Sequence, residues 1–127
     1  MVRIIILLLV HIVGDYFLQG SKLSEQKAVK ISYLFEHVVI YTSLLIVVSP
    51  LALGLTFLQG AAFSILNGST HFIIDFFTSR LKIKYYSESE PKYIITMGID
   101  HSLHLLILFA TYLLLFPDAI SAGYILD

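Results

Sequence analysis

The chain has 127 residues, of which 57% are hydrophobic and only 13% charged, with a formal net charge of -1. Its mean hydropathy of +0.86 is too high for a soluble domain of this size and indicates a membrane protein. The near-neutral charge leaves no basic footprint for nucleic acid, and the absence of cysteine excludes disulfides and thiolate ligands, so nitrogen and oxygen must hold any metal.

Four apolar stretches approach or exceed the roughly 20 residues that a helix needs to cross a bilayer. We therefore predict an all-α polytopic membrane protein, a single domain over 1–127 whose four helices form one bundle. The predicted spans are 2–19, 31–48, 51–77 and 93–116.

The first stretch begins like a signal peptide, but no small-residue cleavage site follows and His11 and Asp15 interrupt it, which predicts a retained span. Only Ser49 and Pro50 separate the second and third stretches, which predicts a tight hairpin with Pro50 near the start of the third helix. Pro117 should end the fourth helix. The tail 118–127 is predicted to be a short interfacial segment.

The Lys and Arg residues predict the orientation, because basic loops are retained in the cytoplasm. Seven of the eight follow the first or third span: Lys22, Lys27, Lys30, Arg80, Lys82, Lys84 and Lys92. Only Arg3 lies on the other side. We expect a protein of the plasma (inner) membrane, with both termini outside and the basic loops cytoplasmic.

Three histidines each pair with an aspartate at a spacing of four inside apolar helices: His11 with Asp15, His71 with Asp75, and Asp100 with His104. The order within the pair reverses where the chain direction reverses. With a rise of 1.5 Å per residue, this places the aspartates in one layer near the cytoplasmic ends and the histidines in the next, deeper layer. Neighbouring polar residues at similar depth are accessory candidates: Gln19, Lys27, Glu36, His37, Tyr41 and His101.

These residues also carry a family resemblance. HIVGDYFLQ at 11–19, HFIID at 71–75 and DHSLH at 100–104, with Lys27 and His37, resemble the small bacterial membrane proteins known as domain of unknown function 3307. That family usually has Gln where this chain has His101, so the resemblance implies that this histidine replaces an amide. A looser similarity to membrane-bound metal-dependent hydrolases implies a metal and hydrolytic chemistry.

Paired His and Asp side chains on facing helices can supply several ligands to one ion, as in helix-bundle metal sites. The predicted ligands are His11, Asp15, His71, Asp75, Asp100 and His104. The ligand types favour Zn²⁺, Mn²⁺ or Fe²⁺. Such an ion could activate water for hydrolysis of a lipid or another membrane-associated substrate, with Asp15, Asp75 and Asp100 as catalytic residues. Lys22, Lys27 and Lys30 could then hold an anionic head group, and the loop lysines in general are expected to set the topology and contact membrane lipids.

Two other classes use the same residues. His and Asp chains also form proton relays, so a proton or metal-ion transporter is an alternative. Four helices make a thin pathway, so that alternative requires a homo-oligomer, and the apolar outer half of the chain counts against it. In a membrane adaptor, the His–Asp pairs would be structural hydrogen bonds between helices.

Overall fold

The computed structural model describes residues 2–117, and the predicted interfacial segment 118–127 lies outside them. The described residues form five α-helices and one π-helical turn, with no strand among them, which confirms the all-α prediction. In chain order these elements are α1 (Val2–Ile12), the π turn η1 (Val13–Phe17), α2 (Gly20–Gln26), α3 (Ile31–Ala52), α4 (Phe57–Glu88) and α5 (Glu90–Leu115).

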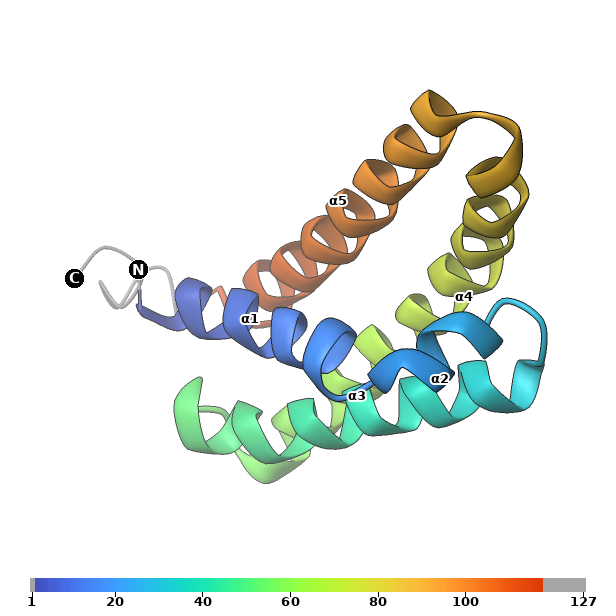
Figure 1. Cartoon of the computed structure of the whole chain (residues 1–127). Coiled ribbons are helices and arrows are strands. Elements are labelled where there is room, and N and C mark those ends of the chain that lie inside the picture. The colour runs from blue at the N-terminus through green and yellow to red at the C-terminus, as the bar shows by residue number, and fades with distance from the viewer. Residues whose placement is uncertain (1, 118–127) are drawn as a thin grey trace.

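Helix α4 is the centre of the arrangement, because α3 packs along one side of it and α5 along another. Helix α1 contacts both α3 and α5, so the first and last helices meet although they are far apart in the sequence. The carboxyl-terminal half of α4 and the start of α5 extend away from the other helices (Figure 1). Helix α2 lies beside α3 at the base of this extension.

The turn between α3 and α4 corrects one prediction. Pro50 lies inside α3 and does not start the next helix. A proline in the last turn removes few helical hydrogen bonds, and the amide of Leu53 still donates to the Ser49 carbonyl at 3.1 Å. The chain reverses one turn later at Gly54, whose φ of 71° suits glycine. Thr56 and Gln59 then form a capping box that starts α4 at Phe57.

The first helix also breaks within its predicted span. It continues into the π turn η1, where the Leu18 amide donates to the Val13 carbonyl at 3.0 Å, and then bends by 83° into α2. Gly14 lies so close to Tyr41 of α3 that a Cβ here would be 2.7 Å from the tyrosine ring. The close approach brings Asp15, in the π turn, into the bundle. Single π turns are frequent at functional sites.

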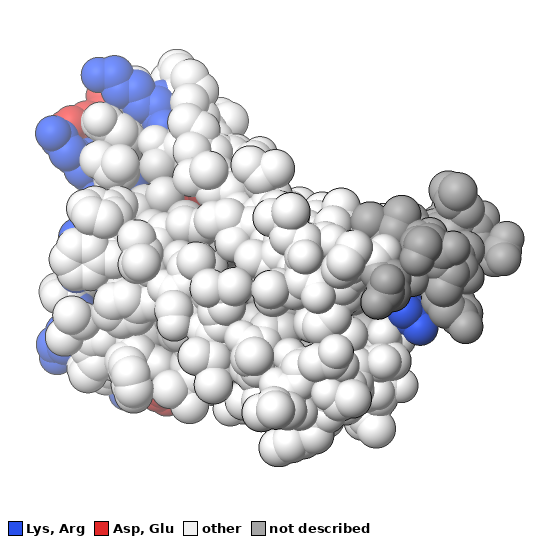
Figure 2. Space-filling model, turned by 180° about the vertical axis from the view of Figure 1, so that it is seen from behind, with Lys and Arg blue, Asp and Glu red and all other residues white. Residues whose placement is uncertain are grey.

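By length and composition, α3 and α5 could each cross a membrane, and α1 with α2 would make a third span if the bent pair is one span. Helix α4 is not among these helices, although its 32 residues measure about 48 Å. Many large apolar side chains on all the long helices are exposed, which is expected of a surface that faces lipid. Charged side chains gather at one end of the face in Figure 2, beside the α4–α5 turn.

Candidate metal centre

Four histidines and three aspartates from five elements, α1, η1, α3, α4 and α5, converge in the interior. We call these residues the His/Asp cluster: His11, Asp15, His37, His71, Asp75, Asp100 and His104. All are buried, with 0–5% of their surface exposed. The spacing of four keeps each His and Asp on one helix face, and α4 between its neighbours brings the three faces together. The six predicted ligands therefore lie close together, and His37 joins them.

The histidine of α3 occupies a more central place than the sequence suggested. His37 Nε2 lies 3.0 Å from His71 Nε2, and both nitrogens lie near the same two carboxylates. Asp15 Oδ1 is 3.2 Å from His37 Nε2 and 3.1 Å from His71 Nε2. Asp75 Oδ2 is 3.3 Å from the first and 3.6 Å from the second. One ring nitrogen carries a single proton or a single lone pair, so neither nitrogen can serve three partners.

Those separations suit metal ligation. Ligand atoms at about 2.0–2.1 Å from a tetrahedral ion lie roughly 3.3 Å apart. His37, His71 and Asp75 are separated by 3.0, 3.3 and 3.6 Å. Three groups of buried residues have ligand atoms within 4.8 Å of one another: His11, Asp15 and His71; His37, His71 and Asp75; and Asp75, Asp100 and His104.

Two of the three carboxylates of the cluster, those of Asp75 and Asp100, form ion pairs with lysines. Lys27 Nζ lies 2.7 Å from Asp75 Oδ2, and Lys82 Nζ lies 2.8 Å from Asp100 Oδ2. Asp100 Oδ1 also accepts a short hydrogen bond from the Thr78 hydroxyl. Asp75 and Asp100 therefore have fixed counter-charges. Each oxygen held in this way is less available to a metal ion.

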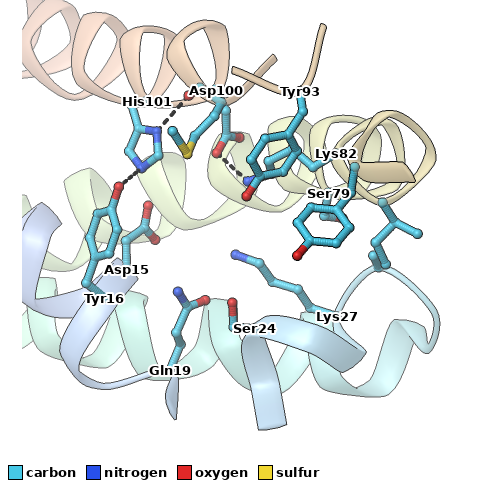
Figure 3. Close-up of a pocket in the computed structure, with 14 residues that line it drawn as sticks. Asp15, Tyr16, Gln19, Ser24, Lys27, Ser79, Lys82, Tyr93, Asp100 and His101 are labelled. Atoms are coloured by element: carbon cyan, nitrogen blue, oxygen red, sulfur yellow. Dashed lines mark hydrogen bonds and ion pairs between the residues drawn. The ribbon is translucent and has the colours of Figure 1, made fainter. Parts of the chain in front are cut away.

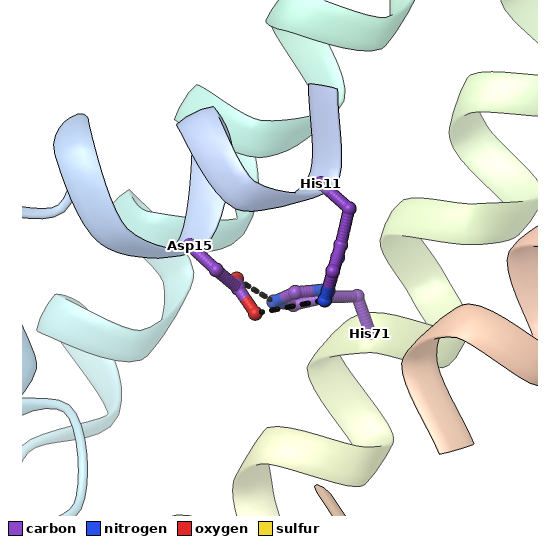
Figure 4. A group of neighbouring side chains, drawn as sticks. All are labelled: His11, Asp15 and His71. Atoms are coloured by element: carbon purple, nitrogen blue, oxygen red, sulfur yellow. Dashed lines mark ion pairs between the residues drawn. The ribbon is translucent and has the colours of Figure 1, made fainter. Parts of the chain in front are cut away.

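Asp15 has no such counter-charge within the described part of the chain, where its ion pairs are with histidines alone. His11 Nε2 lies 3.5 Å from Asp15 Oδ2, while Oδ1 faces His37 and His71. Figure 4 shows the rings of His11 and His71 side by side, both facing this carboxylate. A buried carboxylate requires a cation, which here is either a protonated imidazole or a metal ion.

Several buried atoms of the cluster have no hydrogen-bond partner among the described residues. These atoms include both ring nitrogens of His11, Asp15 Oδ1, Asp75 Oδ1 and His104 Nε2. For His104 the tautomer follows from the geometry. Its Nδ1 is 2.8 Å from the Asp100 carbonyl, which can only accept, so in the neutral imidazole Nε2 holds a lone pair. In a purely structural cluster, buried nitrogens and oxygens are expected to have hydrogen-bond partners. Atoms without such partners are better explained as ligands of a divalent ion.

The other predicted accessory residues separate into three kinds. Tyr41 is buried and stacks on His71, with 4.2 Å between ring centroids. Gln19, Lys27 and His101 line a cavity beside the cluster. Glu36 is exposed and belongs to none of the three groups of possible metal ligands. It directly precedes the buried His37, so the two side chains point about 100° apart around the helix.

That cavity has a volume of about 300 Å³ and lies between α2, η1, α4 and α5 (Figure 3). Asp15 and Asp100 of the cluster line it, so the cluster is accessible from the cavity. On one side the Tyr16 hydroxyl makes a short hydrogen bond to His101 Nε2, while His101 Nδ1 donates to the Met97 carbonyl at 2.7 Å. This pair links η1 to α5.

Sequence reasoning missed two residues of the site, Thr78 and Lys82, and predicted for Lys82 only a loop position that sets the topology and contacts lipid. A signal for both was present, because Thr78 and Lys82 follow Asp75 at spacings of three and seven and so lie on the same face of one helix. This spacing was overlooked because the third span was predicted to end at residue 77, before Thr78 and Lys82. The helix continues to Glu88.

A family model described as "Protein of unknown function (DUF3307)" matches residues 4–126. The chain therefore belongs to this family, as its His and Asp motifs had indicated. No curated protein and no solved structure matches it.

Proposed function

We propose that this protein is a four-span enzyme of the bacterial plasma membrane that uses one divalent metal ion, held by the His/Asp cluster, to hydrolyse a lipid or another membrane-associated substrate. The basic end would face the cytoplasm. The looser similarity to metal-dependent membrane hydrolases is consistent with this reaction class but carries no weight alone.

The fourth span in this proposal is α4. Its hydropathy is low because Asn67, His71, Asp75 and Thr78 lie within it, yet all four are buried against the neighbouring helices. Its outward face is apolar and includes the exposed side chains of Ile65, Leu66, Ile73 and Phe77. A helix with an inward polar face and an outward apolar face is suited to a bundle in lipid.

The observation that carries the metal proposal is the environment of Asp15. It is a buried carboxylate, faced by three histidine Nε2 atoms at 3.1–3.5 Å and without a lysine partner among the described residues. His11, Asp15 and His71 are the ligands best placed to hold the ion, with His37 beside them. These residue types suit Zn²⁺, Mn²⁺ or Fe²⁺.

A bound ion of this kind would supply Lewis-acid activation of water. Asp15 lies where the cluster meets the cavity, so a substrate in the cavity would be next to the ligand group. Asp75 and Asp100, held by Lys27 and Lys82, would position the surrounding histidines: Asp75 faces Nε2 of His71 and His37, and the Asp100 carbonyl orients His104.

Transport is supported less well. Beyond the cluster, between the ends of α1, α3, α4 and α5, the interior is filled by an apolar group that includes Leu7, Leu45, Phe63 and Leu108. A path through one chain would have to cross these side chains. A pathway between the chains of an oligomer would avoid them, and ion flux into liposomes would detect it.

Hydrolysis can be tested with p-nitrophenyl esters of phosphoric and carboxylic acids, using detergent-purified protein stripped with EDTA and then reloaded with Zn²⁺, Mn²⁺ or Fe²⁺. We expect turnover with at least one metal, loss with EDTA and loss in Asp15→Asn. The control is Glu36→Gln, a carboxylate-to-amide change at an exposed residue outside the cluster and the cavity, which should leave turnover unchanged. Equal turnover in wild type and Asp15→Asn would overturn the proposal.

A further inference from the structure

The cavity beside the cluster has features that the metal proposal does not use. Two lysines from different elements reach it, Lys27 after α2 and Lys82 from α4. Lys27 is only 6% exposed, although lysine is rarely buried. In Figure 3 its side chain extends from the α2 end into the cavity, towards the side where Lys82 lies. A buried cation lining a cavity is a candidate ligand for an anion.

Both ammonium groups have donors to spare. The structure gives each lysine one hydrogen bond, Lys27 to Asp75 at 2.7 Å and Lys82 to Asp100 at 2.8 Å. An ammonium has three N–H donors, so two on each lysine are not used by the described side chains. The carboxylates hold the two lysines in place, so each can turn its remaining donors to a ligand without a large rearrangement.

Neutral polar groups complete the lining. Ser24 lies on the α2 side and Tyr93 on the α5 side, and Figure 3 shows both beside the same space as the two lysines. Gln19 adds an amide, whose NH₂ group can donate to an anion while its buried Oε1 can only accept. Donors that approach from several directions suit a tetrahedral anion better than a planar carboxylate, which a bidentate pair from one side satisfies.

The rest of the cavity wall includes the apolar or aromatic residues Ile83, Met97, Tyr16 and Tyr86. The carboxylates of Asp15 and Asp100 also line it, and Lys82 neutralises that of Asp100. The Tyr86 and Tyr93 rings meet edge to face, 5.5 Å apart. Tyrosines are common at the level of lipid head groups, and two of the seven basic residues that follow the predicted first and third spans, Lys27 and Lys82, line the cavity. A volume of about 300 Å³ is at the lower end of small-molecule sites.

We propose that the cavity binds a phosphate ester group, with Lys27 and Lys82 as its cationic ligands. A phosphate group carries up to two negative charges and three acceptor oxygens, which match two ammonium groups and the surrounding donors. This names the substrate class of the hydrolase proposed above and so rests on that function. Binding itself can be measured whether or not the metal is present.

The test is isothermal titration calorimetry of inorganic phosphate into detergent-purified protein, both EDTA-treated and Mn²⁺-loaded. Lys82→Met should weaken binding at least tenfold, and Lys84→Met, an exposed lysine two residues further along α4, should not. Should Lys82→Met not fold, Lys82→Met/Asp100→Asn preserves the charge balance. Binding without metal would support this inference even if hydrolysis is absent.

Native mass spectrometry with dioleoyl phosphatidate and dioleoylglycerol distinguishes a lipid head group from a free phosphate compound. Retention of phosphatidate, but not of the diacylglycerol that lacks phosphate, would assign the site to a lipid, and binding of inorganic phosphate alone would assign it to a soluble ester. No binding of either anion would overturn the inference. The inference would also be overturned if phosphate bound only to the Mn²⁺-loaded protein and Lys82→Met left that binding unchanged. In that case the metal alone would hold the phosphate.

Discussion

Replacing Lys27 by methionine should destabilise the protein strongly, because it leaves Asp75 buried without its counter-charge. The two charged atoms are 2.7 Å apart, with 7% and 1% of their side chains exposed. At an effective dielectric constant of about 20, Coulomb attraction at this distance is about 6 kcal/mol. Desolvation offsets much of that, and removing one partner of a buried pair costs about 3–5 kcal/mol. We expect a loss in that range.

The assay is unfolding in a titration of SDS against mixed micelles, followed by far-ultraviolet circular dichroism. Lys27→Met/Asp75→Asn removes both charges and should recover most of the lost stability. Lys30→Met is the control, because Lys30 is exposed and its ammonium lies over the Tyr33 ring, 5.9 Å from the ring centroid. A loss below about 1 kcal/mol for Lys27→Met, or a double variant as unstable as the single one, would refute the reasoning.

Two further predictions concern packing and hydrogen bonding. Gly14→Ala should cost about 1–3 kcal/mol, because the new Cβ would meet the Tyr41 ring at 2.7 Å. Gly98→Ala, in open space on α5, should be neutral or stabilising by up to about 1 kcal/mol, and equal effects of the two alanines would contradict this account. Asn67→Ala should cost about 0.5–2 kcal/mol of stability, because the Asn67 amide donates to Thr111 Oγ1 at 2.9 Å and so links α4 to α5. An unchanged unfolding midpoint would contradict this prediction.

The sequence predicted the helical class and the meeting of the three His–Asp pairs, because both follow from periodicity. A spacing of four places two side chains on one face, and reversing their order in antiparallel helices keeps them at one depth. The structure brings the pairs together, with His71 of α4 near Asp15 of η1 and Asp75 of α4 near His104 of α5. Their common depth in a membrane stays a prediction. Number and orientation of the spans stay predictions.

The finer details depend on tertiary contacts that no local pattern contains. Pro50 suggested a helix start, but the hydrogen bond of Leu53 to Ser49 and the capping box at Thr56 place the turn later. Helix-breaking signals are weak near a helix end, where few hydrogen bonds are lost. The lysine partner of Asp75 comes from a position 48 residues away, and only the folded chain selects it.

Metal content is the most direct test of the central claim that the His/Asp cluster is a metal site. Protein purified in detergent without added metal would be measured by inductively coupled plasma mass spectrometry, together with His71→Ala, His11→Ala and the control His101→Gln. We predict about one divalent ion per chain in the wild type and in His101→Gln, and a large loss in both alanine variants. A wild type that is folded but holds no stoichiometric metal, even after incubation with Zn²⁺, Mn²⁺ and Fe²⁺, would contradict the account.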